Sequence, residues 1–157
     1  CDWSSDGVLF RSFLVREHLG SALSPGTHGT TFGGNPLSCA AALAVLRVFD
    51  EHDLLGQATR VGAHLLAGLE ALARRHPHAA VGARGRGLLV GLILADGVDP
   101  RAVLTALRDR GVLVSQAGER VIRFAPALVV TEAEIDEGLA ALDAVLAELP
   151  RTPAKAG

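Results

Sequence analysis

The sequence predicts an α/β fold of the α+β kind, a small sheet with helices packed on it. Helix-like and strand-like segments alternate from residue 53 onward, in the order helix, strand, helix, two strands, helix. The chain has 157 residues, 49% of them hydrophobic and 20% charged, which is typical of a folded globular protein of about one ordinary domain. The sequence contains no internal repeat and no low-complexity segment.

The first two helices are predicted from their start signals and their apolar residues. Asn35 can cap a helix that has Pro36 at its first position, and the residues up to Phe49 are almost all apolar. A helix that is apolar on nearly every side is normally buried between layers. A second helix should begin at Asp53 and run to about Arg75, with a one-sided apolar stripe formed by Leu54, Ala58, Val61, Leu65, Leu69 and Leu72.

Strands are predicted next, over residues 80–84 and 87–95, and the second of these is a run of Leu, Val and Ile bounded by glycines. A helix should follow from Asp99-Pro100 and end at Gly111.

The last third of the chain predicts a hairpin and a helix. Residues 112–115 and 121–124 should be short strands joined by a turn at 116–119. Thr131 and Glu134 have the spacing of a capping box, which predicts a final helix ending near Leu149.

Composition excludes several classes of function. A formal charge of −2 gives no electrostatic reason to expect a nucleic-acid partner or an anionic membrane, and no apolar run approaches the roughly 18–20 residues that span a bilayer. Cys1 and Cys39 do not make a disulfide framework, and no Cys/His cluster has the spacing of a zinc site, so we expect no metal and a cytoplasmic protein. The only lysine is Lys155, in a tail over residues 150–157 that we expect to be flexible.

Residues 27–36, which read THGTTFGGNP, hold three glycines and three threonines immediately before an apolar helix. Glycines let the backbone approach a ligand closely, and threonine hydroxyls beside a helix N-terminus suit a phosphate or a carboxylate. A glycine-rich connector before a helix would have the same composition, so the residues alone do not distinguish an anion-binding loop from a connector.

The loop and four later motifs resemble the class III (ornithine-type) pyridoxal phosphate-dependent aminotransferases, and within that family the acetylornithine branch is the most similar. The later motifs are RGRGLLVG from Arg84, GVLV from Gly111, VIRFAPAL from Val121 and TEAEID from Thr131. The resemblance extends over roughly residues 13–149 and follows the order of the family. It implies the C-terminal part of the fold type I architecture, with pyridoxal 5′-phosphate as cofactor.

The resemblance implies a role for three residues. Thr31 would hydrogen-bond the cofactor phosphate of a second subunit in a homodimer, and Thr30 would lie against the substrate bound there. Arg123 would bind the carboxylate of the amino-acid or 2-oxo-acid substrate, which suits a guanidinium. Without the motif, a solvated arginine on a strand is the simpler interpretation of Arg123.

The resemblance also implies that one catalytic residue lies outside this chain. The family holds its cofactor as a Schiff base on a lysine that precedes the loop. In this sequence the position of that lysine would fall at or before Cys1. Lys155 cannot take its place, because it lies near the C-terminus of the chain, far after the loop. We therefore expect a C-terminal piece that is inactive alone, with no catalytic residue of its own. Residues 13–52 would end the large cofactor domain and link it to a small domain at 53–149. Residues 1–12 do not resemble the family and read like a translated sequencing adapter.

Several alternatives stay open at this stage. The parent enzyme would exchange an amino group between N-acetylornithine and 2-oxoglutarate, but a sibling acting on ornithine, succinylornithine or 4-aminobutyrate would share these motifs. A non-catalytic α/β module that stands alone is the alternative from another class. A dinucleotide site at Gly85, Gly87 and Gly91 is set aside, because these glycines precede a strand instead of joining a strand to a helix.

Overall fold

The computed structural model describes residues 16–18 and 34–150. The chain divides into two compact units, and the boundary between them in the sequence falls between His52 and Asp53. In the first unit the described part is mainly one helix, α1, over Pro36–Glu51. Asn35 caps it by accepting a hydrogen bond from the backbone N–H of Ser38 at 2.9 Å, and Pro36 occupies the first turn. The start of this helix is therefore as the sequence predicts.

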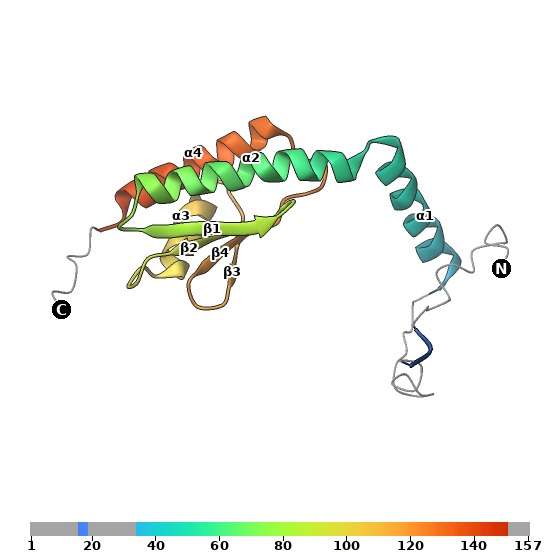
Figure 1. The fold of residues 1–157 in the computed structure, drawn as a ribbon, viewed down its shortest axis with the longest axis horizontal. Helices are drawn as coiled ribbons and strands as arrows, with labels where there is room; N and C mark the ends of the chain where they lie inside the picture. The colour runs from blue at the N-terminus through green and yellow to red at the C-terminus, as the bar shows by residue number, and fades with distance from the viewer. Residues whose placement is uncertain (1–15, 19–33, 151–157) are drawn as a thin grey trace. The chain divides into compact units, whose positions relative to one another are not determined.

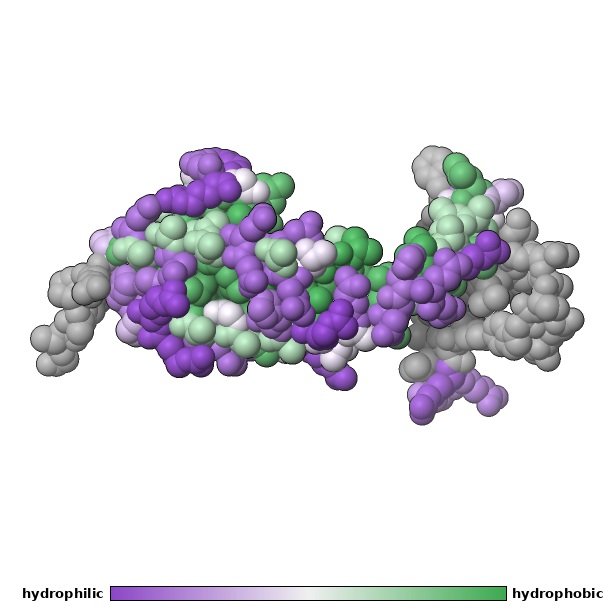
Figure 2. Space-filling view, turned by 90° about the horizontal axis from the view of Figure 1, so that it is seen from above, coloured by the Kyte–Doolittle hydropathy of each residue, from purple (hydrophilic) through white to green (hydrophobic). Residues whose placement is uncertain are grey.

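The surroundings of α1 differ from the prediction that it is buried. Cys39 is its only buried residue, and several large apolar side chains are exposed, among them Leu37 at 80%, Val45 at 55% and Leu46 at 50%. Apolar side chains are visible on the surface of this helix (Figure 2). The sequence specifies an apolar helix, and most of its apolar side chains are exposed in the described part of the chain.

The second unit consists of three helices and a sheet. Its elements in chain order are α2 (Leu54–Arg75), β1 (Ala80–Arg86), β2 (Leu89–Leu94), α3 (Pro100–Asp109), β3 (Ser115–Ala117), β4 (Val121–Phe124) and α4 (Glu132–Glu148). The strands form one four-stranded antiparallel sheet in the order β1-β2-β4-β3. Helix α2 runs along β1, and α4 lies beside α2 (Figure 1). The predicted α+β class is confirmed.

One hydrophobic cluster joins the helices to one face of the sheet. Alternate residues of the central strands, Val90, Leu92 and Leu94 on β2 and Ile122 and Phe124 on β4, point into it. From the predicted stripe of α2, Val61, Leu65, Leu69 and Leu72 belong to the cluster and Ala58 packs against it, whereas Leu54 is buried outside it. The other helices contribute Val103, Leu107, Leu142, Val145 and Leu146. Because strand side chains alternate between faces, the residues between these core positions point to the other face.

The β1–β2 hairpin differs in its bounds from the prediction. Strand β1 continues to Arg86, and a two-residue turn at Gly87 and Leu88 leads into β2, with Arg86 paired to Leu89. Gly87 has φ = +55°, which a tight hairpin turn needs at its first position. The glycines here make a hairpin, so the dinucleotide alternative is also excluded by the local geometry.

The second hairpin is shifted along the chain. The predicted strand over residues 112–115 has no regular secondary structure as far as Val114, and β3 begins only at Ser115. Ala117 pairs with Val121, so the connection is the three residues 118–120, with Gly118 at φ = +66°. Gln116, predicted in the turn, lies on the strand and donates to the carbonyl of Gly118 at 2.8 Å.

The final helix begins as predicted. Thr131 accepts a hydrogen bond from the backbone N–H of Glu134, and the Glu134 carboxylate accepts from the backbone N–H of Thr131 at 2.8 Å, which completes the capping box. The pKa of the Glu134 carboxyl is lowered first by the hydrogen bond from the backbone N–H of Thr131 and then by one from the Thr131 hydroxyl. No helix in the described ranges is long and apolar enough to cross a membrane.

Candidate functional site

Arg123 lies in the middle of the sheet face that the helices leave open. On β4 it pairs directly with Gly91 of β2 on one side and with Ser115 of β3 on the other. Gly91 in turn pairs with Arg84 of β1. Directly paired residues of antiparallel strands point to the same face, so Arg84, Gly91, Arg123 and Ser115 form one row across all four strands. We call this set the cross-strand row.

The row borders an open hollow of about 390 Å³. Arg84 and Arg123 stand at its two sides, and Gly91 lies between them without a side chain. A Cβ atom at Gly91 would come within 2.6 Å of a Val121 methyl group, so the glycine is required for packing. The hollow can therefore admit a small molecule between two guanidinium groups.

The open face is positively charged. The four strands carry the arginines Arg84, Arg86 and Arg123 and no aspartate or glutamate. Within the described residues, no ion pair reaches any of these three side chains, whereas Arg75 and Arg110 are paired with the carboxylates of Asp143 and Glu148. Such a face suits an anionic ligand, and a guanidinium can bind a carboxylate or a phosphate with two parallel hydrogen bonds.

The side chain of Arg123 makes one hydrogen bond among the described residues. Its Nε donates to Ser115 Oγ at 3.0 Å, and its side chain remains exposed. The sequence motif points to Arg123, but Ser115, Gly91 and Arg84 were not predicted as its neighbours in a site. Their proximity depends on strand register, which the sequence does not show until the turn length is known.

The other predicted site residues cannot be placed. Thr30 and Thr31 lie outside the described residues, as does Lys155, so Arg123 is the one predicted site residue whose surroundings the structure shows. Within the described ranges no group of three or more His, Cys, Asp or Glu side chains could hold a metal ion.

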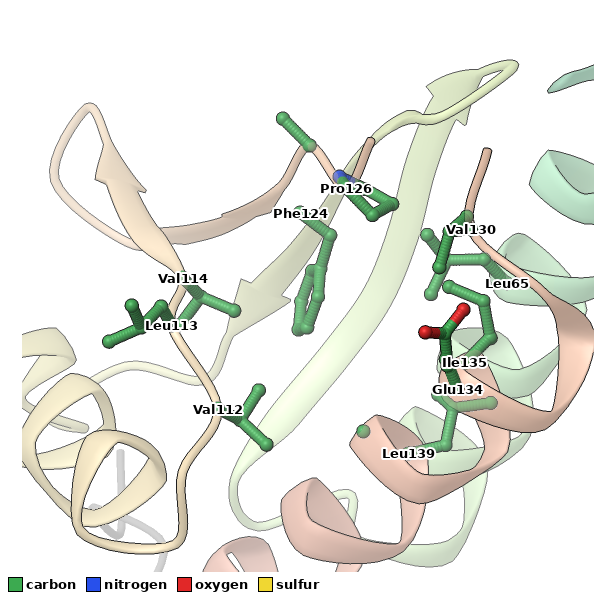
Figure 3. Close-up of a pocket in the computed structure, with 12 residues that line it drawn as sticks. Leu65, Val112, Leu113, Val114, Phe124, Pro126, Val130, Glu134, Ile135 and Leu139 are labelled. Atoms are coloured by element: carbon green, nitrogen blue, oxygen red, sulfur yellow. The ribbon is translucent and has the colours of Figure 1, made fainter. Parts of the chain in front are cut away.

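A second cavity lies on the helix side of the sheet and has a different character. Its volume is about 140 Å³, and side chains such as Leu65, Val112, Phe124 and Ile135 line it (Figure 3). The one charged side chain in its lining is Glu134, whose carboxylate is already used in the cap of α4. The apolar cavity therefore offers packing surface and no reactive group.

The chain is similar to known proteins over most of its length. The family model described as aminotransferase class-III matches residues 4–146. The match includes residues 4–12, which the sequence alone sets apart from the family. The acetylornithine aminotransferase of Gloeobacter violaceus is 47% identical over 148 residues, which are 93% of this chain and 36% of that protein.

Two solved structures are similar in fold as well as in sequence. The acetylornithine aminotransferase of Elizabethkingia anophelis has a TM-score of 0.71 at 32% identity, covering 82% of this chain and 33% of that one. The ornithine aminotransferase of Toxoplasma gondii, whose active site holds pyridoxal phosphate at partial occupancy, has a TM-score of 0.69 at 36% identity. It covers 80% of this chain and 30% of that one. The chain thus spans about a third of the length of the relatives it matches.

Proposed function

The chain belongs to the class-III aminotransferases, and from this membership we propose that it forms part of an enzyme that transfers an amino group from N-acetylornithine to 2-oxoglutarate. The acetylornithine aminotransferases among its relatives support this choice of donor. In this proposal residues 13–52 belong to the end of the cofactor domain and a linking helix, and residues 53–149 form the small domain. We expect the enzyme to act in the cytoplasm, in arginine biosynthesis.

The observation that carries the proposal is that the guanidinium of Arg123 is available to a ligand. The guanidinium is exposed on a sheet face whose strands carry no carboxylate, beside a hollow that Gly91 also lines. Donor and acceptor of the proposed reaction both carry a carboxylate next to the reacting carbon. Arg123 would bind that carboxylate and so orient the reacting carbon toward the cofactor.

The cofactor enters the proposal through the family, which uses pyridoxal 5′-phosphate. When bound, it acts as an electron sink that makes the proton on the substrate's α-carbon acidic. The described residues contain no lysine, so they contribute to the substrate side of the site and not to attachment of the cofactor. Lys155 is a poor candidate for attachment, and we expect the chain alone to be inactive.

Thr30 and Thr31 complete the proposed contribution of this chain. The Thr31 hydroxyl would donate a hydrogen bond to the cofactor phosphate of a second subunit, and Thr30 would line the substrate pocket there. The functional unit would then be a homodimer in which each chain serves both sites.

The second candidate is a closely related transaminase that acts on ornithine. The likeness to the Toxoplasma gondii ornithine aminotransferase favours it over other donors. Arg123 would have the same role in both cases, because ornithine and N-acetylornithine share the carboxylate.

The test is to replace Arg123 in the complete enzyme. Arg123→Ala should raise the KM for 2-oxoglutarate and lower kcat/KM by roughly 10- to 100-fold, which is the loss expected when a charge-assisted hydrogen-bond pair is removed. Arg101→Ala is the matched control, since Arg101 is an exposed arginine on α3, away from the sheet face, and should leave both values unchanged. Equal effects of the two substitutions would contradict the assignment of Arg123.

A further inference from the structure

Ser115 and Arg123 hold a fixed relation in the sheet. They are directly paired residues of β3 and β4, so their side chains leave the sheet on the same face and side by side. The 3.0 Å hydrogen bond from Arg123 Nε to Ser115 Oγ is therefore a consequence of strand register and does not depend on a mobile loop.

This hydrogen bond uses one of the five N–H groups of the guanidinium. The four N–H groups on the two Nη atoms have no hydrogen-bond partner in the part of the chain that the structure describes. Because the guanidinium is planar, fixing Nε also fixes the direction in which the Nη atoms point.

A carboxylate can bind a guanidinium in two ways that use paired hydrogen bonds. It can meet the two Nη atoms end-on, or it can meet Nε and one Nη from the side. Ser115 already accepts the hydrogen of Nε, so the end-on pair remains for a ligand.

The other neighbours of Arg123 do not restrain it. On the β2 side Gly91 has no side chain, and on β1 the Arg84 side chain makes no hydrogen bond or ion pair among the described residues. The two arginines of the cross-strand row thus differ in that Arg123, on the inner strand β4, has a serine beside it, whereas Arg84, on the edge strand β1, does not.

We propose that Ser115 is a positioning residue, which holds Arg123 by its Nε so that the two Nη atoms meet a ligand carboxylate end-on. The carboxylate class follows from the proposed function of Arg123, on which this inference rests. Ser115 itself does not touch the ligand in this arrangement. Its effect is to reduce the rotational freedom that Arg123 would otherwise lose on binding.

The first experiment observes the arginine directly in the full 157-residue chain. Nitrogen-15 NMR of the arginine Nε–H groups should show that the side chain of Arg123 is rigid. Its Nε–H hydrogen should exchange with water roughly 2- to 10-fold more slowly than that of Arg84, a factor that corresponds to one net hydrogen bond. Ser115→Ala should make Arg123 as mobile as Arg84, and Ser115→Thr, which keeps the hydroxyl, should leave it rigid.

A control variant separates the hydroxyl from the hairpin as a whole. Gln116→Ala removes the hydrogen bond from Gln116 to the turn carbonyl without changing the groups beside Arg123. It should leave the Nε–H of Arg123 protected. If Arg123 is as mobile as Arg84 in the unsubstituted chain, or if Ser115→Ala leaves it rigid, the proposal is wrong.

A second experiment separates this inference from the proposed function. Glutarate is added to the same samples, with its neutral diamide as the comparison. Glutarate should shift the Arg123 signals, and Ser115→Ala should weaken its apparent affinity roughly 2- to 10-fold. A rigid Arg123 that does not respond to glutarate would contradict the proposed substrate role of Arg123. A glutarate affinity unchanged by Ser115→Ala would contradict the positioning role of Ser115.

Discussion

Asp143 is the residue whose ionisation most clearly bears on stability. Its carboxylate, on α4, accepts a hydrogen bond of 2.5 Å from Nε2 of His76 and also forms an ion pair with Arg75. His76 is buried, with 8% of its surface exposed. The hydrogen bond from His76 is the main cause that lowers the pKa of the Asp143 carboxyl, and the charge of Arg75 adds to it. The contact joins the end of α2 to α4, two elements far apart in sequence.

The pH dependence follows from the direction of this shift. A carboxyl whose pKa is lower in the folded state stabilises the protein above its unfolded pKa of about 3.9, and the contribution is lost as the pH falls through the folded pKa. We expect Asp143→Ala to lower the free energy of unfolding at pH 7 by about 1–3 kcal/mol, since it leaves a buried imidazole without its partner. Denaturant titrations at pH 7 and pH 3 should show that this difference shrinks at the lower pH. If Asp143→Ala lowered the free energy of unfolding equally at pH 7 and pH 3, the stabilising role of the ionised Asp143 carboxyl would be contradicted.

Gly91 shows how a missing side chain contributes to the site. Its backbone is not in the left-handed region, so the reason for glycine there is space alone, in particular the 2.6 Å approach of a Cβ to Val121 Cγ1. We expect Gly91→Ala to destabilise the protein by about 1–3 kcal/mol through overpacking. The double variant Gly91→Ala/Val121→Ala should recover part of the loss in thermal unfolding, because it removes the methyl group that clashes.

At the scale of elements, two helical glycines have opposite surroundings. Gly62 on α2 is buried, and a Cβ there would lie 2.2 Å from the carbonyl oxygen of Gly87 in the β1–β2 turn. Gly138 on α4 would have no atom within 4 Å of such a Cβ. The first glycine lets α2 approach the hairpin backbone closely, and the second has no such role among the residues that the structure describes.

This contrast gives a matched pair of substitutions. Gly62→Ala should destabilise the protein by about 2 kcal/mol or more, because the backbone it meets cannot rotate away as a side chain can. Gly138→Ala should instead stabilise it by about 0.5–1 kcal/mol through the higher helix propensity of alanine. Chemical denaturation of both variants measures the difference, and a loss of stability in both would show that the space around Gly138 is not free.

The elements also show what the sequence could and could not predict. All four long helices were predicted near their observed bounds, because their caps are local signals carried by Asn35, Asp53, Asp99 and Thr131. The start of β3 was predicted too early, since Val112 and Val114 look like strand residues although they line the apolar cavity outside the sheet. Strand pairing depends on contacts with β4 that no local pattern reveals.

The same limit explains the prediction of the site. Arg123 was found from a motif, and the structure shows it exposed with its Nη atoms available. Its relation to Ser115 requires a three-residue connection between the strands, and a four-residue turn was predicted. An error of this size moves side chains to the opposite face of a strand, so Ser115 could not have been identified from the sequence.

At the scale of the whole molecule, the exposed apolar side chains of α1 dominate the expected behaviour. Leu37, Val45 and Leu46 are each at least half exposed on one 16-residue helix. Exposed apolar surface of this kind drives association. We therefore expect the purified chain to self-associate, and light scattering should give a mass above that of one chain.

Substitutions on α1 test the origin of that association. Val45→Glu/Leu46→Glu should shift the chain toward a single-chain mass by placing charge on the apolar surface. Val129→Glu, at a 60% exposed apolar residue outside α1, is the control and should leave association unchanged. A monodisperse single chain before any substitution would contradict the prediction.

The cross-strand row ties Arg123 to the shortest strand of the sheet. Strand β3 has three residues and lies at the edge of the described sheet, where β4 is its one neighbour. A short edge strand can detach in a local opening that leaves the rest of the fold intact. Each such opening would break the hydrogen bond between Arg123 and Ser115. The guanidinium of Arg123 would then be oriented only during the fraction of time in which β3 is paired with β4. The backbone amide hydrogens of β3 would report that equilibrium by their exchange with solvent.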